Sequence, residues 1–308
     1  MQLINSKVEI IPQEQGLLGV YKQIELAGRT AYKSEDKITE DSAKQFVDML
    51  IGRGHTAPLE HGTIYLKFDL TGIFNQMKEH LEKYRNNPYS KLVIYDWTAY
   101  ITTNARVIYE HGWQDDLQYL CEPEKHHEKR ITARFTCSRS ISHELVRHRT
   151  FSFVQESTRY CNYGKNRFGN NLTFVIPTWA NLQEGEYKNL EYSSEFDRTR
   201  IKINDEWYVF EEELFNEAFA NHIIDPSYFN FIQPLDCAEQ NYLVGLNRGF
   251  KPQQMREILP NALKTEVVMT GFESDWNGFF KLRCDKAAHP DMQKLANELK
   301  ELISNASV

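Results

Sequence analysis

The sequence lacks the features that identify several large classes of protein. No apolar run approaches the roughly 18 residues that a membrane-spanning helix needs, and the first residues do not have the layout of a signal peptide. The 36 basic residues are outnumbered by 43 acidic ones, for a net charge of -7, so an overall basic footprint for nucleic acid is absent. These absences favour a cytoplasmic protein that binds neither a membrane nor nucleic acid.

Cysteine is also scarce. The cysteines are odd in number, lie far apart and form no Cys-x-x-Cys pair (Cys121, Cys137, Cys161, Cys237 and Cys284). This distribution is typical of reduced thiols in a cytosol, and it argues against a disulfide framework and against a zinc site.

Internal repeats, low-complexity tracts and Gly/Ser-rich linkers are missing as well, so residues 1–308 are expected to form one domain. Hydrophobic periodicity predicts both kinds of secondary structure. Strands are expected at 7–11, 63–70, 92–102, 131–135 and 172–176, and helices at 16–29, 39–52, 104–120, 138–147, 197–222 and 290–304. In the strand at 63–70, Ile64, Leu66, Phe68 and Leu70 alternate and share one face, and Asn104 is expected to cap the helix at 104–120. Because strands and helices do not alternate strictly, the expected class is α+β, with a mixed sheet flanked by helices.

The most informative stretch is Arg-His-Arg-Thr-Phe-Ser-Phe-Val-Gln-Glu-Ser-Thr-Arg-Tyr, residues 147–160. If residues 155–159 are extended, Gln155, Ser157 and Arg159 share one face and offer an amide, a hydroxyl and a guanidinium. A guanidinium binds phosphate through two parallel hydrogen bonds, and a hydroxyl completes such a contact. The stretch therefore favours a site for an anionic ligand, and the alternative is a polar surface strand that follows a helix with a basic end.

The same stretch resembles the signature of the flavin-dependent thymidylate synthases, Arg-His-Arg-x-x-Ser-x-Asn-x-x-Ser-x-Arg-Tyr. The matching positions are Arg147, His148, Arg149, Ser152, Ser157, Arg159 and Tyr160. So many positions at fixed spacing are far more specific than a short glycine motif. One position departs from the pattern, because Val154 stands where the family has asparagine.

Further elements resemble the same family. Residues 54–61, Gly-His-Thr-Ala-Pro-Leu-Glu-His, match an element whose last histidine, here His61, lies against the flavin. Arg256 matches an Arg-x-x-Leu-Pro element and Arg283 a Leu-Arg near the C-terminal end, and the family uses both arginines on the nucleotide. Without the resemblance, the histidine would belong to a local turn, and the arginines would be a helix cap and a solvated side chain.

Part of the flavin site of the family has no counterpart in this sequence. The positions that carry asparagine or arginine in better-known members are here Phe272, Ser274 and Gly278. Phenylalanine and glycine side chains donate no hydrogen bonds. The flavin contacts of these positions therefore do not carry over.

The segment His143-Glu144-Leu145-Val146-Arg147-His148 superficially resembles the helix of a zinc protease. Zinc-binding histidines on such a helix lie at i and i+4, whereas the spacing here is i and i+5, which turns the second histidine away. We therefore predict no metal site. Glu144 precedes Arg147 by about one helical turn and is expected to orient it.

The resemblance implies the reductive methylation of dUMP to dTMP, with methylenetetrahydrofolate as carbon donor and NADPH as reductant of bound FAD. It implies a dUMP site made of Glu144, Arg147, Ser157, Arg159, Arg256 and Arg283, and an FAD site made of His61, His148, Arg149 and Gln155. Arg283 and Ser157 are the catalytic candidates, and Arg283 would stabilise charge that develops on the uracil. Ser157 is expected to be a binding hydroxyl, because a nucleophilic serine needs a partnered base.

The family forms homotetramers, so a homotetramer is expected here. Compared with compact members, the chain has surplus sequence that predicts insertions near 71–130 and 161–200. Two other functions stay open. One is a nucleotide-binding or sensor module without turnover, and the other is RNA binding by residues 147–160 as a basic and aromatic patch, which the acidic balance disfavours.

Overall fold

The computed structural model describes residues 1–165, 169–188, 191–195, 198–203, 206–209 and 226–306. The chain divides into two compact units. Unit 1 comprises Met1–Lys7, Thr136–His143 and Ser157–Thr265, and unit 2 comprises Val8–Phe135, Glu144–Glu156 and Glu266–Val308. Each unit contains both helices and strands, and the predicted α+β class is confirmed.

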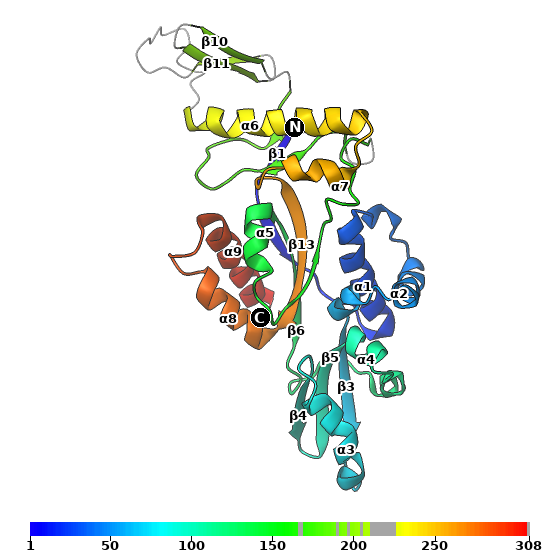
Figure 1. The fold of residues 1–308 in the computed structure, drawn as a ribbon. Coiled ribbons are helices and arrows are strands. Elements are labelled where there is room, and N and C mark those ends of the chain that lie inside the picture. Colours follow the sequence, from blue (N-terminus) through cyan, green and yellow to red (C-terminus); the bar gives the residue numbers. More distant parts are fainter. Residues whose placement is uncertain (166–168, 189–190, 196–197, 204–205, 210–225, 307–308) are drawn as a thin grey trace. The chain divides into compact units, whose positions relative to one another are not determined.

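A three-stranded mixed sheet organises unit 1. Strand β1 (Gln2–Ile4) pairs in parallel with β8 (Thr173–Val175) and antiparallel with β9 (Gly185–Glu186). Helix α6 (Pro226–Asn247) follows later in the chain (Figure 1), with α7 (Pro252–Met255) and the short 3-10 helix η6 (Arg256–Ile258) after it. Buried side chains of the strands and of α6 share one core that includes Leu3, Phe174, Ile232, Leu235 and Tyr242.

A second sheet of unit 1 corrects a prediction. Strands β10 (Glu191–Glu195), β11 (Arg198–Ile203) and β12 (Glu206–Val209) are paired antiparallel in sequence order. The sequence predicts a helix over 197–222 instead, and the part of it from 210 on lies outside the described residues.

The reason for that error is visible in the sequence of β11. Its residues Thr199, Ile201 and Ile203 alternate with Arg200 and Lys202, which gives a period of two as well as the helical spacing. Threonine and isoleucine are β-branched, and their restricted side chains favour strands over helices.

The larger core lies in unit 2, under an antiparallel sheet of β3 (Thr63–Asp69), β5 (Thr98–Asn104) and β4 (Lys91–Tyr95). The predicted alternation is confirmed, because Ile64, Leu66, Phe68 and Leu70 are all buried. Helix α3 (Phe74–Arg85) lies beside the sheet (Figure 1) and adds two buried side chains to the same core.

The predicted strand at 92–102 is a hairpin of two strands. It folds back at Asp96 and Trp97, whose φ angles are 46° and 57°. Two successive residues with positive φ are typical of the tight turns that match the twist of a hairpin.

The helices of unit 2 follow the predicted order with shifted ends. Helix α1 (Gly16–Tyr32) packs on α2 (Ser42–Gly52), with η1 (Glu35–Lys37) between them in sequence and η2 (Ala57–His61) after them. Helix α2 begins three residues after the predicted start at Thr39.

The predicted helix at 104–120 is two short helices. Asn104 caps α4 (Ala105–Glu110), as predicted, because its side-chain oxygen accepts the N–H of Val107 at 3.1 Å. The helix ends before Gly112, whose φ of 71° is incompatible with its continuation. A 3-10 helix, η3 (Gln114–Tyr119), follows.

A four-stranded sheet has the order β2 (Lys7–Ile10), β6 (Arg130–Ser138), β13 (Lys264–Phe272) and β7 (Ser152–Gln155). Helix α5 (Arg139–Leu145) follows β6, and α8 (Glu273–Arg283) and α9 (Pro290–Ala306) follow β13 and lie side by side (Figure 1). Within the described residues, no helix is long and apolar enough to cross a membrane.

Candidate functional site

The segment 147–160 is only partly a strand. β7 ends at Gln155, and the Ser157 carbonyl oxygen accepts the N–H groups of Tyr160 and Cys161 at 3.2 and 3.1 Å, which forms a turn. The Ser157 hydroxyl oxygen also accepts the N–H of Arg159 at 3.3 Å. Serine commonly stabilises turns in this way. The prediction that Gln155, Ser157 and Arg159 share the face of one strand is therefore wrong.

In unit 2, the structure brings together three of the predicted residues, Glu144, His148 and Arg283. The Arg283 guanidinium, at the end of α8, donates from Nη1 to Glu144 Oε2 at 2.6 Å and from Nη2 to the Glu144 carbonyl oxygen at 3.2 Å. Its Nε donates to His148 Nε2 at 2.9 Å. One carboxylate, one carbonyl and one imidazole thus fix the plane of this guanidinium.

This geometry determines the proton on His148. Because Nε2 accepts from Arg283, the imidazole is neutral and carries its proton on Nδ1. Burial and the positive charge of Arg283 lower the pKa of His148 to about 4. Phe279 packs edge-on against the ring, with centroids 5.0 Å apart, and holds it in place.

Glu144 does not act as predicted. Its carboxylate pairs with Arg283, whereas the sequence predicts that it orients Arg147. The reason is that α5 ends at Leu145, so Arg147 lies in a turn and the spacing of a helix no longer applies to it.

Arg147 and Arg149 are exposed on either side of His148. Neither guanidinium forms an ion pair within the described part of the chain. Two unpaired guanidiniums so close in sequence suit the oxygen atoms of a phosphate or another anion.

His61 lies in a separate, buried network of unit 2. The residue is 0% exposed, and its Nδ1 lies 2.8 Å from Thr270 Oγ1, which in turn lies 2.8 Å from Thr132 Oγ1. Its Nε2 is buried and has no hydrogen-bond partner among the described residues. Burial, with a smaller effect of the Arg130 charge, lowers the pKa of His61 to about 3, so the ring is neutral.

Arg130 is a residue that the sequence analysis missed. Its guanidinium donates to the Glu60 carbonyl oxygen at 2.9 Å and to Ser152 Oγ at 3.4 Å, and burial lowers its pKa to about 10. No motif in the sequence marks Arg130, because it ends the charged run at residues 122–130, which is typical of a solvated loop. Its contact with Ser152, a member of the signature, is visible only in three dimensions.

The positions that depart from the family pattern have local explanations. Val154 is 7% exposed and pairs with Val268 across the sheet, so an apolar side chain suits it. The Phe272 ring lies under two cations, with Lys91 Nζ at 5.4 Å and the Arg130 guanidinium at 5.5 Å from its centroid. Phe272 thus covers Arg130 where the family offers a polar side chain.

The other two departures are simpler. Ser274 donates its hydroxyl to the Glu128 carboxylate. Gly278 is exposed on α8, and a Cβ added there would meet nothing within 4 Å.

The remaining predicted residues belong to unit 1. Ser157 is half-buried, and Arg159 is exposed with its guanidinium 5.2 Å from the centroid of the Tyr160 ring. Arg256 is exposed in η6, and its Nε lies 3.6 Å from a carboxylate oxygen of Glu257. Unit 1 therefore carries a hydroxyl and two guanidiniums with the chemistry of an anion site.

The sequence matches the family model of Thy1, the thymidylate synthase complementing proteins, over residues 126–307. That range is more than half of the chain, and the chain belongs to this family. It includes α5 and α8, which carry Glu144 and Arg283, and the turn between α5 and β7, which carries His148.

Similar proteins include the flavin-dependent thymidylate synthase of Corynebacterium glutamicum, which is 27% identical over 165 residues, 52% of each chain. That of Mycobacterium marinum is 29% identical over 170 residues, 55% of each chain. The chain thus spans about half the length of the curated relatives it matches. A crystal structure of the UMP/dUMP methylase PolB from Streptomyces cacaoi bound with 5-Br dUMP aligns with 16% identity and a TM-score of 0.40, covering 100% of this chain and 92% of that one.

Proposed function

We propose that this protein is a flavin-dependent thymidylate synthase that methylates C5 of dUMP to give dTMP. The carbon comes from methylenetetrahydrofolate, and NADPH is the reductant. Family membership supports the reaction class, and the observation that carries the proposal is the fixed guanidinium of Arg283 between Glu144 and His148.

The donor groups of unit 2 fit the anionic part of FAD. Arg147 and Arg149 are exposed without ion pairs in the described part of the chain; Arg149 is proposed to bind the phosphate oxygens of FAD, and Arg147 those of dUMP. His148 lies between them, and Gln155 ends the strand that follows. When bound, the flavin supplies the reducing hydride for the pyrimidine.

His61 fits the same role only after a rearrangement. Its ring is fully buried, so a flavin reaches it only if the surrounding side chains move. Its Nε2, which has no partner among the described residues, is the atom that would gain a hydrogen bond from such a movement.

Arg283 is proposed to stabilise negative charge on a uracil carbonyl oxygen. Three of its five N–H groups are used by Glu144 and His148, which leaves two for the substrate. A guanidinium that is already fixed loses little freedom when the charge develops, and this preorganisation is what makes electrostatic stabilisation effective.

Ser157, Arg159 and Arg256 are proposed to bind the phosphate of dUMP, and Ser157 acts as a hydrogen-bonding hydroxyl. Its oxygen already accepts the N–H of Arg159, which ties the hydroxyl to the turn that carries that arginine. We further propose that the protein is a homotetramer in the cytoplasm. Each subunit is then a single catalytic domain with insertions near 71–130 and 161–200.

The proposal is tested by Arg283→Lys, with Arg53→Lys as the control at an exposed arginine. Lysine keeps the charge but loses the planar fork, so turnover of dUMP is expected to fall by at least about tenfold while flavin content stays unchanged. Turnover equal to that of the control would remove Arg283 from the reaction. If the unmodified protein binds FAD and dUMP without forming dTMP, a nucleotide sensor is the better description.

A further inference from the structure

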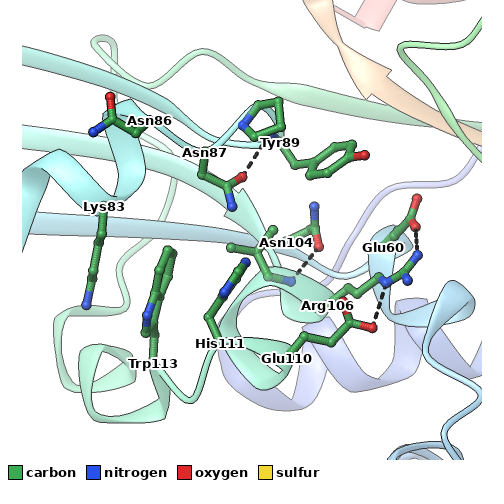
Figure 2. Close-up of a pocket in the computed structure, with 12 residues that line it drawn as sticks. Glu60, Lys83, Asn86, Asn87, Tyr89, Asn104, Arg106, Glu110, His111 and Trp113 are labelled. Carbon is green, nitrogen blue, oxygen red and sulfur yellow. Dashed lines mark hydrogen bonds and ion pairs between the residues drawn. The ribbon is translucent and has the colours of Figure 1, made fainter.

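Unit 2 contains a second site that the proposed reaction does not use. A cavity of about 440 Å³ lies where the end of α3, the α3–β4 connection and α4 meet, and Figure 2 shows its lining. Small-molecule sites typically have volumes of ~300–1,000 Å³. The cavity is lined by Glu60, Lys83, Asn86, Asn87, Pro88, Tyr89, Asn104, Arg106, Val107, Glu110, His111 and Trp113.

One wall of the cavity is a flat stack of side chains. The His111 ring stacks on Trp113 with centroids 4.6 Å apart and an angle of 20° between the planes. Lys83 Nζ lies 4.8 Å from the Trp113 ring, so the three side chains stand in a row in Figure 2. The charge of Lys83 is neutralised from behind by Asp116, 2.6 Å away. The wall therefore offers a flat surface without a free cation.

Another wall offers hydrogen-bond acceptors. Arg106 is held by Glu110, with Nε to Oε1 at 2.9 Å, and by Glu60, with Nη1 to Oε1 at 2.5 Å. Thr56 also donates to Glu110 Oε1, at 2.6 Å. All of these contacts are with an Oε1 atom. Within the described part of the chain, the Oε2 atoms of Glu60 and Glu110 therefore stay available as hydrogen-bond acceptors.

Asparagine side chains add the donors. Asn104 is 2% exposed, and its side-chain oxygen is used by the cap of α4. Its Nδ2 has no partner in the regions that the structure describes, and Figure 2 shows it directed towards the space between Asn87 and Tyr89. The Asn87 side-chain oxygen is likewise occupied, by the N–H of Tyr89 at 2.9 Å, so its amide N–H groups are left as donors.

The four charged side chains of the lining are two acidic and two basic, and each cation is already paired. An anion would meet the two carboxylates, and a cation would meet Lys83 and Arg106. The remaining groups are carboxylate acceptors, amide donors and a flat aromatic surface. Neighbouring hydroxyl groups on a ring donate and accept at once, and the apolar face of such a ring packs on an aromatic side chain.

We propose that this pocket binds a neutral ring with adjacent hydroxyl groups, either a free sugar or the ribose of a nucleoside. The ring face packs on His111, the hydroxyl groups donate to Glu60 and Glu110, and the amide of Asn104 donates to a ring substituent. The site lies in the predicted insertion near 71–130 and in the flanking Glu60, and it does not depend on the proposed synthase reaction.

The test is calorimetric titration of the full chain with three probes, uridine, 2′-deoxyuridine and methyl α-D-glucopyranoside. A nucleoside site is identified if uridine binds and 2′-deoxyuridine binds with an affinity about tenfold lower, because it lacks one hydroxyl group. Binding of the glucoside identifies a sugar site. Failure of both uridine and the glucoside to bind overturns the proposal, and so does equal binding of uridine and 2′-deoxyuridine without binding of the glucoside.

Matched variants show whether the binding occurs in this pocket, which matters because uridine also resembles the proposed substrate. His111→Ala removes the stacking surface and is expected to weaken binding by about tenfold. His126→Ala is its control, because His126 stacks on Tyr95 in the same manner, at 4.2 Å and 21°, outside the pocket. Binding that is equal in both variants contradicts the assignment.

A second pair of variants tests the same pocket in case His111→Ala fails to fold. Glu110→Gln keeps the shape of the side chain and removes its charge, and it is expected to weaken binding by roughly tenfold. Glu124→Gln is the control, because Glu124 also pairs with a cation, Lys67 at 2.7 Å, but does not line the pocket. If Glu110→Gln binds the probe as tightly as Glu124→Gln, the carboxylate has no role and the proposal fails.

Discussion

Two histidines of unit 2 are kept neutral by their surroundings. Burial is the largest cause of the lowered pKa of His148, and the positive charge of the Arg283 guanidinium beside it lowers that pKa further. His61 is fully buried, and desolvation is the largest cause of its lowered pKa. A neutral His148 can accept from Arg283, whereas a protonated one would repel it. The contact that positions Arg283 is therefore stable throughout the neutral pH range.

His61 makes the stability of the protein depend on pH. Its pKa is about 3 in the folded state and roughly 6.5 when unfolded. As the pH falls through this window, the unfolded chain binds a proton that the folded chain does not, so stability is lost. Between about pH 7 and about pH 5, this single group is expected to lower the free energy of unfolding by about 2 kcal/mol.

The measurement is urea denaturation of His61→Gln at both pH values. Glutamine does not titrate, so the loss between the two pH values should shrink by about 2 kcal/mol relative to the parent protein. His55→Gln, at an exposed histidine, is the control. An unchanged pH dependence in His61→Gln would mean that His61 is not the buried titrating group.

At the scale of helices and strands, the sequence predicted best where the pattern is local. The alternation in β3 and the capping side chain of Asn104 are short-range features, and both predictions are confirmed. The helix predicted at 197–222 failed because the β11 stretch has two periods at once, and pairing with β10 and β12 decides between them. The period of a single stretch does not show whether neighbouring segments pair with it, so the pattern of β11 alone could not decide between a helix and a strand.

The same limit applies to the candidate site. The signature predicted which residue types matter, but the partner of Glu144 is Arg283, which lies 139 positions away in the sequence. Arg130 was missed because its environment is formed by the Glu60 carbonyl, Ser152 and Phe272, which are distant in sequence. The role of a residue depends on contacts between distant parts of the chain, and the spacing of residues in the sequence does not show these contacts.

One strand position tests how tightly this site is packed. A Cβ at Gly271 would lie 2.3 Å from Cδ1 of Phe151, whose ring is wedged against Trp276 with centroids 4.7 Å apart. Gly271→Ala is therefore expected to destabilise the protein by about 1–3 kcal/mol, because the aromatic cluster has no room to move.

The matched control is Gly278→Ala, where the added methyl group meets nothing within 4 Å. This variant should stabilise helix α8 by about 0.5–1 kcal/mol, because glycine is a poor helix former. Urea denaturation measures both. Equal stability of the two variants would show that the packing around Phe151 is looser than described.

For the molecule as a whole, the surroundings of the cysteines favour the proposed flavin chemistry over a mechanism with a thiol nucleophile. Cys161 and Cys137 are 0% exposed, and burial raises the pKa of Cys137 to about 12. Burial also raises the pKa of Cys121 to about 11. A nucleophilic thiolate needs the opposite, a lowered pKa and partial exposure.

Cys161→Ala and Cys284→Ala are therefore expected to turn over dUMP at rates near that of the parent protein. A strand continuing through Arg159 would place Cys161 on the same face as that arginine, but the strand ends at Gln155 and the thiol lies in the core of unit 1. A Cys161→Ala protein that folds and binds FAD and dUMP, yet forms no dTMP, would favour a thiol nucleophile.

The most direct test of the central claim follows the flavin and the product together. The purified protein is loaded with FAD, reduced with NADPH in the absence of oxygen, and then mixed with dUMP and methylenetetrahydrofolate that carries a labelled methylene carbon. The proposed function predicts that the flavin absorbance returns only when both are present, and that the label appears in the methyl group of dTMP. Reoxidation without labelled dTMP, or labelled dTMP formed equally well by protein stripped of flavin, would contradict it.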